Sequence, residues 1–212
     1  DVLLMMHHGI VSHFNWQDKI MGEYLVKDWQ KHAKQFAKMG IKVCFTGHFH
    51  SQDISQKYGL TDIETGSTVS YPHPYRLIDV DTDKGVMQIR SEKVQTLASM
   101  HDAPETLQQK SEHFASSAFC SVMETMVPQK VPADVKKNCA QVLGEAYAMH
   151  LAGDEHPSAS FKQQLKSAVK QLKHYSWKWA FIMQRIGKYL STDTGESDNQ
   201  TTIKYKNKTN RG

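Results

Sequence analysis

Histidines are the residues of this chain with the clearest capacity for chemistry, and four of them lie in two short segments. These segments are His7-His8-Gly9 and Gly47-His48-Phe49-His50. The neutral imidazole is the commonest metal ligand among side chains that titrate near neutral pH. Three or four converging imidazoles suit a transition metal, whereas Ca²⁺ and Mg²⁺ prefer oxygen ligands.

Each histidine segment directly follows a short apolar run. Residues 2–6 form a continuous apolar stretch, which is typical of a central strand covered on both faces, and residues 41–45 are expected to form a second short strand. Apolar residues between them recur at spacings of three and four, which predicts one amphipathic helix over 15–39 with Asn15 as its N-cap and Gly40 just after its end. A strand, a helix and a strand in this order indicate two parallel neighbours, whose carboxyl ends share one edge of the sheet. The two histidine segments are therefore expected to lie close together.

The rest of the chain contains first a region of predicted strands and then a region of predicted helices. Residues 52–92 contain four short runs typical of strands, at 53–58, 61–64, 75–81 and 86–90, and the last two are expected to form a hairpin. Four helical patterns follow, one that ends near residue 126 and three over 133–151, 161–172 and 177–190. We expect the first helix to have Asp102 as its cap and Pro104 in its first turn. We therefore expect three parts: residues 1–95, a helical subdomain over 96–190, and a loose basic tail over 191–212. The last helix carries a broad apolar surface suited to packing on the first part: Trp177, Trp179, Phe181, Ile182 and Ile186.

Composition narrows the class of protein. With 39% hydrophobic and 23% charged residues, the chain can bury a core, so wholesale disorder is excluded. The longest apolar run is far shorter than the roughly 18 residues of a membrane span. A net charge of +4 does not indicate a nucleic-acid partner. Cys44, Cys120 and Cys139 form no metal-binding spacing and are expected to be small buried thiols, with a Cys120–Cys139 bridge as the alternative.

The order of these segments resembles a known family. It runs from a strand into His7-His8-Gly9, through a helix and a strand into Thr46-Gly47-His48-Phe49-His50, and on to Ile63-Glu64-Thr65-Gly66-Ser67 and the hairpin that begins at Tyr75. This order is similar to the C-terminal half of the calcineurin-like metallophosphoesterase superfamily, over residues 2–92. The resemblance implies an α/β fold, namely the C-terminal half of a four-layer α/β/β/α sandwich, followed here by a helical subdomain outside the family core.

The resemblance also implies an activity and site residues. It implies metal-dependent hydrolysis of phosphate mono- or diesters at a dinuclear site holding two divalent or trivalent transition metal ions (Mn, Fe, Zn, Co or Ni). By this resemblance His7 and His48 ligate the second metal, His50 ligates the first, and His8 stands beside these ligands.

Histidines outside the two segments are expected to have other roles. His13 follows the first segment, so we expect it either to contact a substrate phosphate or to be a surface residue at the start of the helix. His73 is expected to belong to a loop. The five histidines of the helical region are expected to be packing or solvent residues: His101, His113, His150, His156 and His174.

The chain departs from the family pattern in its other ligands. Neither Gly-Asp-x-x-Asp nor Gly-Asn-His occurs in it, and no Asp-x-His precedes the two histidine segments. We expect the missing carboxylate and amide ligands to come from a segment of the same protein ahead of Asp1, and we expect these 212 residues alone to be nearly inactive on a phosphoester substrate.

Two other interpretations remain open. One is a binding or scaffold protein that keeps the fold without the metals. The other is a histidine-rich metal-binding module, which would take up metal without hydrolysis and lose tight binding when His50 alone is replaced. The helical subdomain is expected to cover the site, bind a partner or set the oligomeric state.

Overall fold

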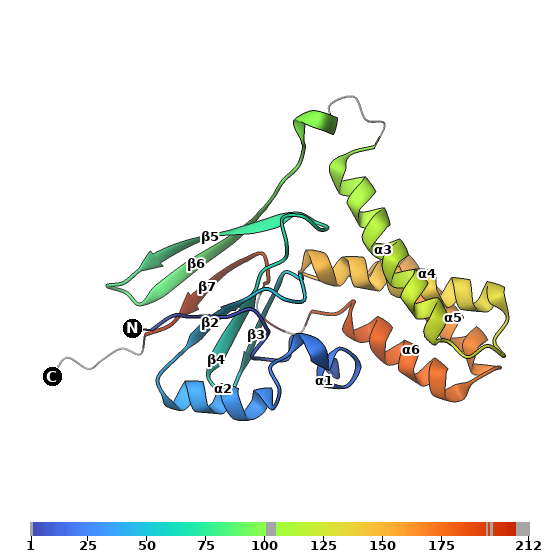
Figure 1. Cartoon of the computed structure of the whole chain (residues 1–212), viewed down its shortest axis with the longest axis horizontal. Helices are drawn as coiled ribbons and strands as arrows, with labels where there is room; N and C mark the ends of the chain where they lie inside the picture. The colour runs from blue at the N-terminus through green and yellow to red at the C-terminus, as the bar shows by residue number, and fades with distance from the viewer. Residues whose placement is uncertain (1, 101–104, 194, 196, 207–212) are drawn as a thin grey trace. The chain divides into compact units, whose positions relative to one another are not determined.

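A computed structural model describes residues 2–100, 105–193, 195 and 197–206 of the chain. The chain divides into two units, which we call the α/β unit (Asp1–Val94 with Thr194–Gly212) and the helical unit (Gln95–Asp193). Over the described residues the fold is mixed α/β with two sheets and six α-helices (Figure 1). His101, Asp102 and Pro104 lie outside the described residues.

The first sheet of the α/β unit has the strand order β1-β2-β4-β3. Its strands are β1 (Leu4–Met5), β2 (Val43–Thr46), β3 (Asp53–Lys57) and β4 (Leu60–Glu64). β1 and β2 are parallel, β2 and β4 are parallel, and β3 is antiparallel to β4. The parallel pairing expected for the strands before the two histidine segments is therefore confirmed.

Among the described residues, the first apolar run is not the covered central strand that was expected. β1 has two residues and, among the described strands, pairs only with β2. Met5 is 81% exposed, and Val2 and Leu3 are also exposed. An edge strand meets a neighbour on one side only, so a continuous apolar run does not by itself establish a central position.

The single helix expected over 15–39 is also wrong. The segment forms α1 (Gln17–Ile20), a 3-10 turn (Gly22–Tyr24) and α2 (Trp29–Lys38), and α1 is preceded by Trp16 rather than capped by Asn15. The helix breaks because the chain here pairs with the first histidine segment. The N–H of Gly9 donates to the carbonyl of Tyr24 at 3.1 Å, and the N–H of Val26 donates to the carbonyl of Gly9 at 2.9 Å. A tertiary contact has overridden the helical periodicity.

The end of α2 follows its sequence signal. Gly40 has a φ of +88°, which a residue with a Cβ adopts only at a cost. Its N–H donates to the carbonyl of Ala37, and the N–H of Ile41 donates to the carbonyl of Phe36. These are the two hydrogen bonds of a Schellman motif, so the prediction of Gly40 just after the helix is confirmed.

The second sheet has the order β5-β6-β7. β5 (Pro74–Asp81) and β6 (Val86–Lys93) form the expected antiparallel hairpin, so that prediction is confirmed. β7 (Gln200–Lys204) pairs antiparallel with β6, so the segment 191–212, expected to be loose, contributes a strand. β7 has a polar sequence with a single large apolar residue, which gave no strand signal.

Two buried apolar clusters lie between the layers of the α/β unit (Figure 1). One lies between α2 and the first sheet, and the other lies between the two sheets. The first contains Ile10, Val11, Ala33, Ile41, Cys44 and Leu60. The second contains Val43, Ile54, Ile63, Met87, Ile89 and Tyr205. The unit therefore has a helix layer and two sheet layers.

The helical unit contains α3 (Leu107–Met126), α4 (Ala133–Ala152), α5 (Ala159–Lys173) and α6 (Trp177–Tyr189), so its four predicted helices are confirmed. α3 begins after a Thr106 capping box rather than after Asp102. Trp177 and Phe181 of α6 are exposed, whereas Ile186 is buried. All three cysteines of the chain are free, so the alternative of a Cys120–Cys139 bridge is wrong. None of the described helices has the length and apolar character needed to cross a membrane.

Candidate functional site

The two histidine segments meet at the carboxyl ends of β1 and β2. The carbonyl of His7 accepts hydrogen bonds from the N–H groups of Gly47 and His48, at 3.2 and 3.0 Å. The ring nitrogens His7 Nε2 and His48 Nδ1 lie 2.7 Å apart. Backbone and side-chain contacts thus join the two segments, as the parallel strands predicted.

Two further rings lie against His48. The ring of His8 is 4.2 Å from that of His48 between centroids, and the ring of Tyr24 is 5.1 Å from it. Tyr24 belongs to the turn that interrupts the expected helix, and its ring also contacts Phe49 edge-on at 4.8 Å. The break between α1 and α2 therefore places an aromatic ring on the histidine cluster, which we define as His7, His8 and His48.

The surroundings of His48 favour its neutral form. Burial lowers the pKa of His48, and the nearby His8, His7 and His50 lower it further when they carry charge, against an opposing contribution from Glu23. A neutral imidazole is the form that binds a metal, because the ligand nitrogen must be free of its proton.

His50 ends the second segment in a strained backbone conformation. Its φ is +64°, which is uncommon for a residue other than glycine, and it is exposed. The chain beside it is crowded, because a Cβ on Gly66 would lie 2.9 Å from the His50 carbonyl oxygen. His50 affects the pKa of His48 through its charge, so it belongs to the surroundings of the histidine cluster.

His13 has neither of the two expected roles. Its side chain has no exposed surface and lies among three carboxylates. His13 Nδ1 is 2.5 Å from Asp53 Oδ1, and His13 Nε2 is 3.1 Å from Glu64 Oε2 and 3.4 Å from Asp62 Oδ2. Both expectations for His13, a substrate contact and a surface position, are wrong, because its side chain is fully buried.

The charge state of His13 follows from those neighbours. Burial on its own would lower the pKa of the imidazole, but the carboxylates of Asp53, Glu64 and Asp62 together outweigh burial. They hold the pKa of His13 well above its ordinary value of 6.5. His13 is therefore a buried cation at neutral pH.

A pocket of about 550 Å³ opens beside β3 and β7 in the α/β unit. His13 belongs to its lining together with Ser12, Ser55, Lys57 and Lys204. The carbonyl of His13 accepts a hydrogen bond from Ser55 Oγ, while the imidazole is covered by the carboxylates. The histidine cluster does not line this pocket.

Two other histidines have structural positions. His73 is buried in a loop, as expected, and its Nδ1 lies 3.1 Å from the carbonyl oxygen of Thr68. His150 is buried in α4, with Nδ1 at 2.6 Å from Glu155 Oε1. Both are consistent with packing rather than ligand binding.

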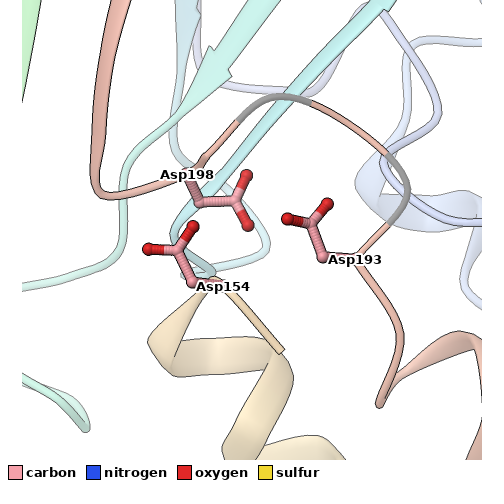
Figure 2. A group of neighbouring side chains, drawn as sticks. All are labelled: Asp154, Asp193 and Asp198. Carbon is pink, nitrogen blue, oxygen red and sulfur yellow. The ribbon is translucent and has the colours of Figure 1, made fainter. Parts of the chain in front are cut away.

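Figure 2 shows three aspartates, Asp154, Asp193 and Asp198, which lie after α4, after α6 and before β7 rather than inside a sheet. Asp154 and Asp193 belong to the helical unit, and Asp198 belongs to the α/β unit, where its Oδ1 accepts the N–H of Ile54 at 2.7 Å. Asp154-Glu155-His156 is also the one Asp-x-His triplet of the sequence, and it follows α4 rather than a strand. Acidic groups commonly gather without an ion, and these three belong to two different units, so we assign them no metal.

The histidine cluster offers a donor set that fits a transition metal. Zinc binds imidazole nitrogens at about 2.0–2.1 Å in tetrahedral geometry, so two such nitrogens lie about 3.4 Å apart. The 2.7 Å between His7 Nε2 and His48 Nδ1 is a hydrogen-bond distance, which a small ring displacement would widen to that value. No carboxylate oxygen contacts these two nitrogens among the described contacts, so the donors described at this point are imidazoles alone.

Three residues around the cluster were missed in the sequence. They are Tyr24, hidden by the expected helix, and Asp62 and Glu64 of β4, which are buried carboxylates. The sequence Leu60-Thr-Asp-Ile-Glu64 did carry a signal, because two acidic residues inside a buried strand need polar partners there.

Comparison with known proteins adds no assignment. No protein-family profile matches the chain, and no curated protein matches it significantly.

Proposed function

We propose that this chain forms part of a metal-dependent phosphoester hydrolase of the calcineurin-like metallophosphoesterase superfamily. The observation that carries the proposal is the assembly of His7, His8 and His48 where two parallel strands end, with His50 in strained backbone next to it. Ligand sites of parallel sheets lie at this edge, and strained backbone gathers at functional sites. The layers of the α/β unit, one helix layer and two sheets, also suit one half of a four-layer sandwich.

The proposed roles follow the positions of the side chains. His7 and His48 would hold one metal ion, because their nitrogens already approach each other, and His50 would hold a second. The ring of His8 lies tilted against the ring of His48 and would fix its position. When bound, two such ions polarise a phosphoryl oxygen and make water a nucleophile near neutral pH.

The chain's own residues would bind and orient the ions, and the lowered pKa of His48 favours its neutral imidazole, which has one ring nitrogen able to bind a metal. In the part of the chain that the structure describes, no carboxylate touches the two facing nitrogens of His7 and His48. We therefore propose that acidic and amide ligands come from polypeptide outside these 212 residues.

The direct test is hydrolysis. The full-length protein, loaded with Mn²⁺, is expected to hydrolyse an aryl phosphate monoester or diester, and these 212 residues alone are expected to do so far more slowly. Metal analysis of the full-length protein should find two ions per chain. Absence of bound metal and of hydrolysis in the full-length protein would support a non-catalytic scaffold instead, and metal without hydrolysis would support a metal-binding module.

A further inference from the structure

Two buried acidic residues of β4 lie behind the histidine cluster. Asp62 and Glu64 are 0% and 1% exposed, and they are two residues apart on one strand. Alternate residues of a strand project from the same face of the sheet. Both carboxylates therefore reach the loops that follow β1 and β2.

Asp62 connects the two histidine segments. Its Oδ2 accepts hydrogen bonds from the N–H groups of Ile10 and Val11, at 2.7 and 2.9 Å. Its Oδ1 accepts one from the hydroxyl of Thr46 at 2.6 Å. Ile10 and Val11 directly follow His7-His8-Gly9, and Thr46 directly precedes Gly47-His48, so one carboxylate fixes the chain on both sides of the cluster.

Glu64 holds the backbone of the second histidine segment through Phe49. Its Oε1 accepts the N–H of Phe49 at 2.8 Å, and Phe49 lies between His48 and His50. Its Oε2 lies 3.1 Å from Nε2 of His13, which is itself paired with Asp53. Hydrogen bonds to ionised acceptors are about twice as strong as neutral ones, and a buried N–H without an acceptor is costly.

We propose that Asp62 and Glu64 are positioning residues, which hold the imidazoles of His7 and His48 facing each other, within a small ring displacement of the separation that a shared metal ion needs. This inference rests on the proposed function for its purpose, but the positioning itself is a property of the metal-free chain. Groups that orient metal ligands in this way typically change metal affinity by 10- to 100-fold when they are replaced.

The substitutions Asp62→Asn and Glu64→Gln test the proposal with nearly unchanged shape. Each removes the negative charge and leaves one oxygen instead of two, so the hydrogen bonds that the side chain still accepts from the N–H groups become weaker. Thr46→Val removes a single hydrogen bond to Asp62 and is the milder variant if Asp62→Asn does not fold. Asp79→Asn is the matched control, because Asp79 is an exposed acidic residue of the neighbouring sheet.

The main readout is the nuclear Overhauser effect between the ring protons of His7 and His48 in the metal-free 212-residue chain. The two ring centroids are 4.4 Å apart, so the wild type and Asp79→Asn should show it. Asp62→Asn and Glu64→Gln should weaken it strongly, and Thr46→Val should weaken it less, while contacts between β5 and β6 persist as the sign of a folded unit. Zn²⁺ affinity should fall by roughly 10- to 100-fold in the first two variants.

The outcomes separate this inference from the proposed function. An unchanged ring contact in Asp62→Asn and Glu64→Gln, or in Thr46→Val where these do not fold, would overturn the positioning role, and so would its absence in the wild type. Weakening or loss of the ring contact in the variants supports the positioning role even if the full-length protein hydrolyses no phosphoester, a result that would refute only the proposed function.

Discussion

His7 Nε2 and His48 Nδ1 lie 2.7 Å apart, although 40 residues separate them in the chain. Because β1 and β2 are parallel neighbours, the residues that follow the two strands meet at one edge of the sheet. The hydrogen bonds from Gly47 and His48 to the carbonyl of His7 hold this approach through the backbone. The pair is therefore a product of the sheet topology and not of two flexible side chains.

Replacing His13 by glutamine should change how stability depends on pH. The folded-state pKa of His13 is raised above 6.5, so its charge stabilises the fold fully below pH 6.5, and this contribution is lost as the pH rises toward the folded value. His13→Gln should cost about 3 kcal/mol or more of unfolding free energy below pH 6.5, because it leaves three carboxylates without their cation.

Urea unfolding of both proteins at several pH values between about 6 and 9 measures this difference. The gap between the wild type and His13→Gln should be largest at the acidic end of the range and narrow as the pH rises. A gap of constant size across the range would show that the pKa of His13 is the same in the folded and unfolded protein, which would contradict the raised folded-state pKa.

The three thiols should be slow to react in the folded protein. Burial raises the pKa of Cys44 to about 12 and that of Cys139 to about 11, and it also raises the pKa of Cys120. The thiolate is the reactive form, so at pH 8 Cys44 and Cys139 should not react with a disulfide reagent such as Ellman's, and Cys120 should react slowly. In urea all three should react at once; fast reaction of Cys44 or Cys139 without denaturant would contradict the burial described here.

Two helix glycines of the helical unit should differ in their response to alanine. A Cβ on Gly144 would lie 2.6 Å from the carbonyl oxygen of Ser116 and 2.6 Å from Cys120 Sγ, so α3 would have to move. A Cβ on Gly187 would meet the movable end of the Leu165 side chain instead.

Gly144→Ala should therefore destabilise the fold by about 1–3 kcal/mol, despite the higher helix propensity of alanine. Gly187→Ala should cost less or stabilise the fold. Thermal unfolding of the two variants beside the wild type checks this order, and equal melting temperatures for the two would contradict the close approach of α3 to α4.

Local patterns in the sequence predicted most of the elements. The hairpin of β5 and β6, the four helices of the helical unit and the turn at Gly40 were all predicted, because each depends on periodicity or on glycine within a few residues. The break between α1 and α2 was not predicted, since it depends on hydrogen bonds between Gly9 and residues 24–26. β7 is a strand because β6 offers it a partner.

The same distinction applies to the candidate site. The meeting of His7 with His48 followed from the order of strands and helix, so it was predicted. The burial of His13 depends on Asp53, Asp62 and Glu64, which come from two strands 40 to 51 residues further along the chain. Nothing local to His13 distinguishes a buried cation from a residue at the surface.

The central claim, that the histidine cluster binds a transition metal, is tested most directly by titrating the 212-residue chain with Zn²⁺ in a calorimeter. The comparison is between the wild type, His48→Ala and His156→Ala, whose exposed histidine in the helical unit is the matched control. We expect the wild type and His156→Ala to bind Zn²⁺ alike and His48→Ala to bind it at least tenfold more weakly. Equal binding by His48→Ala and the wild type, or no binding by either, would contradict the claim.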